Sequence, residues 1–265
     1  MNTTNPLINL SQSDTVVTIE LNRPQSGNAL TQSMVETLSA IFFELETSDD
    51  VRAVVLSGSG QHFCAGGDIK EMCRISQSNE GQTTVWNFNR SFGRLVSRVT
   101  ACPHLVIALV HGSVLGGGFG LTCGADLVVA HKDTMFSMPE TKLGIVPAQI
   151  APFVVQRIGL TQARRLALLG EKIDASTATD LGLVHYLSDS HQHMQQQTAS
   201  IIKQIKQCAP QATAATKKLM MNIEQLSPEQ LLDHGADVFC AALTGPEGQE
   251  GVTAFMQKRK PSWTI

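Results

Sequence analysis

Short apolar runs alternate with segments of helical periodicity along the N-terminal part of the chain. Four of these runs predict strands, at Val16–Leu21, Ala53–Leu56, Leu105–Val110 and Asp126–Ala130. After the first run, apolar residues from Thr31 onward recur at helix spacing. Either Thr31 or Ser33 can serve as the N-cap of that helix. Strands that alternate with helices predict parallel βαβ units with right-handed crossovers, and therefore an α/β core.

The rest of the chain is mostly helical in pattern. Further helices are predicted at Val85–Val99, Thr161–Leu169 and Ala175–Leu181, with a short strand at Leu183–Leu187. From His193 onward the pattern is helical, with breaks at Pro210, Pro228 and Pro246. We therefore expect two parts: a core over residues 1–200, and an all-helical part over residues 201–265 that packs on the core or on a neighbouring subunit.

Composition excludes several classes of protein. The chain has 265 residues, 42% of them hydrophobic and 16% charged, which is typical of a globular protein with a sizeable core. Its net charge is −3, and its longest basic cluster is only Lys258-Arg259-Lys260. These features argue against nucleic acid and anionic membranes as partners.

Signals for export are also missing from the sequence. Met1–Leu10 has neither the positive segment nor the apolar segment of a secretory signal, and no apolar run approaches the roughly 20 residues of a membrane span. The six cysteines include no CxxC pair, so they are expected to be reduced thiols. We therefore expect a cytoplasmic protein.

Glycine-rich turns often bind phosphates, but the known patterns fail here. A GxGxxG motif starting at Gly116 or Gly118 would need glycine where Leu121 or Cys123 stands. A P-loop starting at Gly112 fails because Gly118 occupies the lysine position. Neither GxSxG nor HExxH occurs, and His191-Gln192-His193 lies in a polar segment typical of a solvated helix start. The sequence thus predicts no metal site.

Two glycine-rich turns remain, at His62–Lys70 and at His111–Gly120. Each follows a predicted strand and precedes a predicted helix, so its main-chain N–H groups can point outward at a helix N-terminus. Two such turns on adjacent strands could direct two N–H groups at one oxygen atom, which is the requirement of an oxyanion hole. The alternative is that these glycines only form tight turns.

A third motif centres on Glu140. Pro139 keeps Met138 extended, so Glu140 lies in a stiff turn after a strand, with mostly apolar neighbours. A carboxyl group in such surroundings loses hydration, which raises its pKa and suits it to proton transfer. The alternative is a glutamate that caps the next turn or pairs with Lys142.

These three stretches, together with Asn22-Arg23-Pro24 and Asn28-Ala29-Leu30, resemble the enoyl-CoA hydratase/isomerase (crotonase) superfamily in order and spacing. The resemblance implies a crotonase-like spiral of ββα units whose helical C-terminal part mediates homotrimers or homohexamers. It also implies an acyl-CoA substrate, so that coenzyme A is part of the substrate and no separate cofactor is needed.

The resemblance further assigns roles to residues of the motifs. Glu140 is the expected catalytic acid–base, and the N–H groups of Gly67 and Gly117 are expected to bind the thioester oxygen. Arg23 and Lys258 are candidates for the phosphates of coenzyme A. The other residues expected to contact the substrate or its coenzyme A part are Ala65, Gly66, Asp68, Ile69, Lys70, Gly116 and Gly120.

One position departs from the two-glutamate hydratases of the superfamily. Their second glutamate matches Glu140, but their first falls at Gly120. The missing carboxylate removes a like charge near a substrate carboxylate, and we expect it to make room for a branch at C3. The segments Gly116–Leu121, Pro139–Gly144 and Pro147–Val155 are similar to bacterial hydratases of 3-branched glutaconyl-CoA thioesters, and Gln156–Leu168 and Phe255–Trp263 most resemble the isohexenylglutaconyl-CoA member of that group. This similarity implies hydration of isohexenylglutaconyl-CoA in acyclic terpene degradation, or of 3-methylglutaconyl-CoA in leucine degradation.

Other functions remain open at this point. A single carboxylate beside an oxyanion hole also suffices for a Δ3,Δ2-enoyl-CoA isomerase, which moves a proton between C2 and C4. A non-catalytic or RNA-binding relative is a third alternative, against which the net charge and an aromatic content of 5% argue. Phe119 and Phe153 suit either an acyl pocket or the core, and Cys64 is expected to be a buried, inert thiol.

Overall fold

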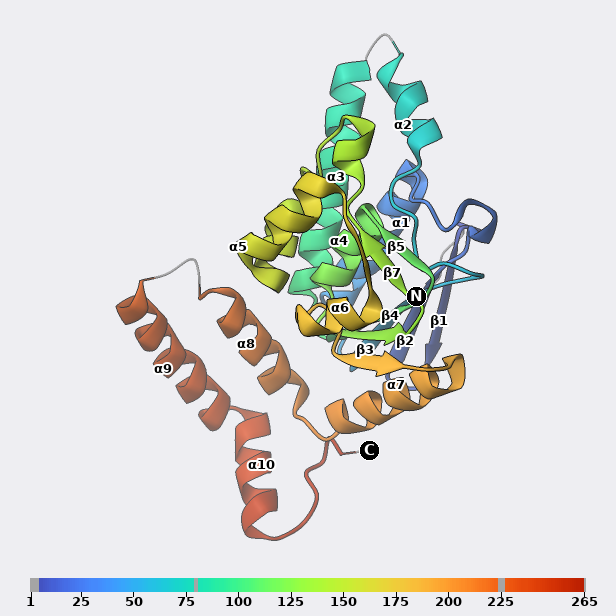
Figure 1. The fold of residues 1–265 in the computed structure, drawn as a ribbon. Helices are drawn as coiled ribbons and strands as arrows, with labels where there is room; N and C mark the ends of the chain where they lie inside the picture. The colour runs from blue at the N-terminus through green and yellow to red at the C-terminus, as the bar shows by residue number, and fades with distance from the viewer. Residues whose placement is uncertain (1–4, 79–80, 224–226, 265) are drawn as a thin grey trace.

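A six-stranded sheet and a smaller three-stranded sheet form the frame of the computed structural model, which describes residues 5–78, 81–223 and 227–264 (Figure 1). The large sheet has the order β1-β2-β3-β4-β6-β9. All its neighbouring strands are parallel except the β1–β2 hairpin. The strands are β1 (Ile8–Ser13), β2 (Val16–Leu21), β3 (Ala53–Gly58), β4 (Leu105–Val110), β6 (Leu127–His131) and β9 (Tyr186–Ser188).

The small sheet forms a second layer, in which β5 (Ser113–Leu115) follows β4 of the large sheet along the chain and β7 (Met135–Ser137) follows β6. Its third strand is β8 (Lys172–Asp174), and β5 and β7 are parallel. An isolated bridge from Cys64 to Val114 adds the segment after β3 to this layer. Each of β3, β4 and β6 is thus followed by a short extended segment and then by a helix. The predicted α/β spiral of ββα units is therefore confirmed.

Helices cover the sheets and enclose the core. Thr31, one of the two residues predicted as N-cap, caps α1, because its Oγ1 accepts a hydrogen bond from the Met34 N–H. Strands β3 and β4 are almost wholly buried, as expected for the centre of a parallel sheet. The helices of this part are α1 (Gln32–Leu45), α2 (Ile69–Ser76), α3 (Gly81–Ala101), α4 (Gly117–Gly124), α5 (Ala151–Leu169) and α6 (Ala175–Asp180), with 3₁₀ turns η1 (Pro24–Ser26) and η2 (Glu140–Leu143).

Some elements differ from the sequence prediction. Helix α5 begins ten residues before the predicted start, and Gly159 interrupts it with a φ of +75°. The periodicity is lost at this kink, which explains why only the second half was predicted. Strand β1, which is mostly exposed beyond Ile8, and the three-residue strand β8 were not predicted. Strand β9 lies at the end of the stretch predicted as a strand, at Tyr186–Ser188.

The C-terminal helices are α7 (His191–Ile205), α8 (Pro210–Met221), α9 (Pro228–Thr244) and α10 (Pro246–Met256). The last three begin at proline, which suits the first turn of a helix. Met194 and Ile201, both on α7, pack against Val55, Ile107 and Val129 of the large sheet. The boundary expected between residues 200 and 201 is therefore wrong, because it cuts a helix that belongs to the core.

Helices α8–α10 extend away from the sheets (Figure 1). No residue of α8 or α9 is buried, although these helices carry large apolar side chains such as Leu232 and Phe239. The tail therefore presents an apolar surface to solvent in the isolated chain. Among the described residues, no helix has both the length and the apolar content needed to cross a membrane. Residues 1–4, the start of the segment tested for a secretory signal, lie outside the described part.

Candidate active site

The two glycine-rich turns and Glu140 meet at one place. A Cβ atom on Gly116 would lie 2.9 Å from Oε1 of Glu140 and 3.7 Å from the Cα of Gly66. Gly116 has a φ of +47° and Gly66 a φ of +102°, a region that side chains rarely allow. Glycine is therefore needed here both for the turn and for the close approach of the two chains.

Two main-chain N–H groups at this place are free to bind a ligand. Gly67 forms an isolated parallel β-bridge with Leu30. The hydrogen bonds of this bridge run from the Leu30 N–H to the carbonyl of Gly66 and from the Asp68 N–H to the carbonyl of Leu30. Gly117 begins α4, so its N–H has no partner within the helix. Neither N–H donates a hydrogen bond to any residue that the structure describes. The positive end of the α4 dipole adds to the attraction for a negative oxygen.

Close packing fixes the start of α4 against the first turn. A Cβ atom on Gly118 would lie 2.6 Å from the carbonyl oxygen of Cys64. The carbonyl of Cys64 also accepts a hydrogen bond of 2.9 Å from the N–H of Leu115. The two turns thus form one rigid unit, in which the N–H groups of Gly67 and Gly117 are preorganised.

Glu140 is the acidic group of the site. It opens η2, and its Oε2 is buried without a hydrogen-bond partner among the described residues. Burial raises the pKa of the carboxyl above its ordinary value, and only the N–H of its own main chain opposes this effect. A half-buried carboxyl with an unused oxygen and a raised pKa is suited to taking up and returning a proton.

The turn that carries Glu140 is tied to the C-terminal end of α5. Thr141 Oγ1 donates to the carbonyl of Ala167 at 3.0 Å, and Lys142 Nζ donates to the carbonyl of Gly170 at 2.7 Å. Carbonyl groups at a helix C-terminus lack partners within the helix and attract a cation. Lys142 therefore pairs with α5 rather than with Glu140, and the alternative of a Glu140–Lys142 pair is wrong.

A cavity of about 140 Å³ connects these groups. Of the predicted site residues, Ala65, Gly66, Gly67 and Ile69 from the first turn line it, together with Gly116, Gly117 and Glu140. Its walls are otherwise mostly apolar. The sequence did not assign the remaining wall residues, which come from separate segments: Leu30, Val35, Met72, Phe88, Asn89, Phe92, Pro139, Leu143 and residues 145–150.

Gly120 does not line this cavity. A Cβ atom at this position would lie 2.3 Å from Cγ2 of Ile150 and 3.7 Å from Cε1 of Phe92. The space that a longer side chain would need is thus filled by Ile150. The expectation that Gly120 leaves room for a substrate branch is therefore wrong, since the room is already occupied by the protein.

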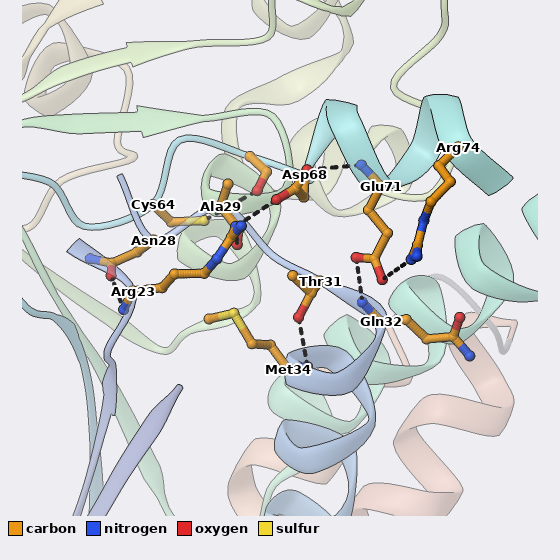
Figure 2. Close-up of polar contacts among 11 residues, drawn as sticks. Arg23, Asn28, Ala29, Thr31, Gln32, Met34, Cys64, Asp68, Glu71 and Arg74 are labelled. Carbon is orange, nitrogen blue, oxygen red and sulfur yellow. Dashed lines mark hydrogen bonds and ion pairs between the residues drawn. The ribbon is translucent and has the colours of Figure 1, made fainter. Parts of the chain in front are cut away.

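Arg23 forms an ion pair inside the protein (Figure 2). Its Nη1 lies 2.6 Å from Oδ2 of Asp68 and donates to the carbonyl of Ala29 at 3.1 Å. Asp68 is also the N-cap of α2, accepting from the Glu71 N–H. Burial opposes ionisation of Asp68, but the Glu71 N–H and the Arg23 guanidinium outweigh it and hold its pKa below the ordinary value. The pair therefore fixes α2 beside the first turn.

The other predicted coenzyme A contacts lie outside the cavity. Lys70 is exposed on the first turn of α2, next to Ile69, whose side chain is 50% exposed at the rim. Lys258 is exposed beyond the end of α10, in the tail that extends from the core. Within this chain, Lys258 therefore does not contribute to the cavity.

Three further residues of the motifs serve the core. Burial raises the pKa of the Cys64 thiol to about 12, so this cysteine stays protonated and inert, as expected. Phe119 is fully buried and packs edge to face on Phe136. Phe153 lies on α5, outside the cavity, whose aromatic wall is formed by Phe88 and Phe92 of α3.

Comparison with known proteins decides the family. The family model described as enoyl-CoA hydratase/isomerase matches residues 11–265. The chain belongs to the enoyl-CoA hydratase/isomerase family. Within it, the chain is 46% identical to an enoyl-CoA hydratase/isomerase from Marinobacter aquaeolei, covering 98% of this chain and 99% of the other, with a TM-score of 0.93. For AtuE of Pseudomonas aeruginosa the identity is 47%, with 98% and 100% covered and a TM-score of 0.93.

The enoyl-CoA hydratase/isomerase family includes more than one reaction among the relatives of this chain. The peroxisomal Δ(3,5)-Δ(2,4)-dienoyl-CoA isomerase of Arabidopsis thaliana is 32% identical over 266 residues, which cover 96% of this chain and 95% of that protein. Membership therefore identifies an enzyme of the hydratase/isomerase type that acts on CoA thioesters. The choice between hydration and isomerisation depends on the groups in the cavity.

Proposed function

We propose that this protein is a hydratase that adds water across the 2,3 double bond of a 3-branched glutaconyl-CoA thioester. The observation that carries the proposal is the buried, unpartnered carboxyl oxygen of Glu140 beside the free N–H groups of Gly67 and Gly117 in one cavity. Isohexenylglutaconyl-CoA is the first choice of substrate, and 3-methylglutaconyl-CoA is the second. Both choices rest on the resemblance of residues 147–168 and of the C-terminus.

The N–H groups begin the reaction by binding the thioester oxygen. Hydrogen bonds from Gly67 and Gly117 draw electrons from the conjugated double bond and make C3 electrophilic. Charge that develops on this oxygen in the transition state meets two donors and the start of α4, none of which has to reorganise. The enolate is thereby stabilised by groups of the main chain.

Glu140 moves the proton in both halves of the reaction. As a carboxylate it takes a proton from water while the water oxygen bonds to C3 and the double-bond electrons shift toward the thioester oxygen. As a carboxylic acid it then returns that proton to C2, which restores the thioester carbonyl. One carboxyl group can serve in sequence because burial raises its pKa toward the working range of the enzyme.

A direct assay tests the proposal. Purified protein with isohexenylglutaconyl-CoA or 3-methylglutaconyl-CoA should lose the absorbance of the conjugated enoyl thioester and form a 3-hydroxyacyl-CoA. Straight-chain crotonyl-CoA serves as the comparison substrate and should react more slowly, because it lacks the C3 branch and the distal carboxylate of the proposed substrates. If the protein consumes neither of the two branched thioesters, the proposed reaction is refuted.

The alternative reaction is Δ3,Δ2-enoyl-CoA isomerisation, which the presence of a single carboxylate also favours. A 3-enoyl-CoA incubated with the protein in deuterated water distinguishes the two reactions. Migration of the double bond with deuterium incorporation, but without net addition of water, would favour the isomerase. A hydratase should give the hydroxylated product only from the 2-enoyl thioester.

We also propose that the tail assembles the protein into a homotrimer or homohexamer. Phe255 is 85% exposed, and Leu232, Phe239 and Met256 are each exposed by more than half in the isolated chain. An apolar surface of this kind on a protruding helical arm is typical of an interface between subunits. Sedimentation equilibrium should therefore give a mass of three or six chains, whereas a monomer at micromolar concentration would contradict this assignment.

A further inference from the structure

Two amide side chains interrupt the mostly apolar lining of the cavity. Among the lining residues, Asn89 and Gln149 are the two that carry an amide, and Glu140 is the one that carries a charge. Both amide side chains are half-buried, and neither forms a hydrogen bond with a residue that the structure describes. Amides that border an apolar cavity without partners leave their donors and acceptors to a ligand.

The amide of Gln149 rests on the face of α3 that carries Asn89. Asn89 precedes Gly93 by four residues, so the two positions are neighbours one helical turn apart. A Cβ atom on Gly93 would lie 1.9 Å from Oε1 of Gln149. The amide of Gln149 therefore rests directly on the main chain of α3, in a position that only glycine at residue 93 permits.

A cation completes this group. Nη1 of Arg90 lies 3.3 Å from the same point beside Gly93, and Arg90 forms no ion pair with a described residue. Arg90 is exposed and does not itself line the cavity, but its guanidinium lies near the amide of Gln149, which does. Five N–H donors in a planar fork make arginine the side chain best suited to a carboxylate.

The group lies close to the reacting end of the substrate. The residue before Gly93 is Phe92, whose Cζ lies 3.3 Å from the Cβ position of Gly117. Ile150, the residue after Gln149, packs against Gly120. Gly120 lies on α4, the helix that begins at Gly117. A short acyl chain whose thioester oxygen is held by Gly117 can therefore extend to the amides.

We infer that Asn89, Gln149 and Arg90 bind a carboxylate at the distal end of the acyl chain, and that Gly93 keeps the place open for Gln149. This inference rests on the proposed function, which it deepens by assigning residues that select dicarboxylic acyl chains. The cation also offsets the repulsion between a substrate carboxylate and Glu140, which share one cavity.

Binding of two unreactive thioesters tests the inference without the need for turnover. Glutaryl-CoA carries a distal carboxylate, whereas butyryl-CoA ends where that carboxylate would begin. Calorimetry should give a Kd for glutaryl-CoA that is about tenfold lower than that for butyryl-CoA, as expected for hydrogen bonds to a charged group. In R90M and Q149L this preference should fall to about twofold or less, because the Kd for glutaryl-CoA rises more than that for butyryl-CoA.

Two further variants separate the proposed role from a general loss of structure. Gly93→Ala keeps all three polar side chains but displaces the flexible end of Gln149, so it should also lose the preference. Arg94→Met removes an arginine of α3 that lines a separate hollow with Ser39 and Phe43 of α1, away from Gly93, and should keep the preference. Equal affinity of the unmodified protein for both thioesters, or equal weakening of both in R90M and Q149L, would overturn the inference. Absence of hydration with an intact preference would instead count against the proposed reaction alone.

Discussion

Replacement of Glu140 by glutamine should lower kcat for hydration by about 10³-fold or more, because one side chain performs both proton transfers. The amide has nearly the same shape, but it cannot take a proton from water or return one to C2. Oε2 of Glu140 has no partner among the described residues, so the substitution breaks no hydrogen bond of that atom. The variant should therefore fold normally and bind the thioester with a KM close to that of the unmodified protein.

The pH dependence should follow the same group. Burial raises the pKa of Glu140, and the reaction begins from the carboxylate, so kcat/KM should fall as the pH drops through this raised pKa. The midpoint should lie above the value of an ordinary glutamate, and the remaining activity of Glu140→Gln should not show this limb. Glu44→Gln, which removes an exposed carboxylate on α1, is the matched control and should leave rate and profile unchanged. A fully active Glu140→Gln enzyme would remove Glu140 from the mechanism.

The sequence was most informative where backbone conformation dictates the residue. Gly66 and Gly116 adopt left-handed conformations and approach other main-chain atoms closely, so their place is visible as a run of glycines. Pro210, Pro228 and Pro246 mark the starts of three helices for a similar reason, since proline fits the first turn. These local constraints predicted both turns and the boundaries of the tail helices.

Relations between distant segments could not be predicted in this way. The Arg23–Asp68 pair joins η1 to α2, and one cavity is lined both by Asn89 of α3 and by Gln149 of the segment before α5. Neither arrangement has a periodic or compositional signal. A sequence that shows one arginine beside a proline does not tell whether its guanidinium faces solvent, a phosphate or a buried aspartate. The sequence predicted a phosphate as the partner of the Arg23 guanidinium. In the fold, its partner is the carboxylate of Asp68.

Gly120→Glu should not produce a two-glutamate hydratase but should destabilise the protein. The first atom of the new side chain would lie 2.3 Å from Cγ2 and 3.0 Å from Cβ of Ile150, which is almost completely buried at the start of α5. Overpacking of this kind costs about 1–3 kcal/mol, because α4 and α5 must move apart. Since α4 also presents the N–H of Gly117, activity on the branched thioesters should fall together with the free energy of unfolding.

The loss of a carboxylate at residue 120 and the presence of Ile150 should therefore be coupled, and a double-mutant cycle can measure this coupling. Ile150→Ala alone leaves a cavity and should cost about 2–5 kcal/mol. In the Gly120→Glu background the same change removes the clash, so the double variant should be more stable than the sum of the single effects predicts, by at least about 1 kcal/mol. Denaturant unfolding of all four proteins gives this value, and hydration of crotonyl-CoA by the double variant reports whether the second carboxylate reaches the water. Additive stabilities would mean that Ile150 does not decide which residue can occupy position 120.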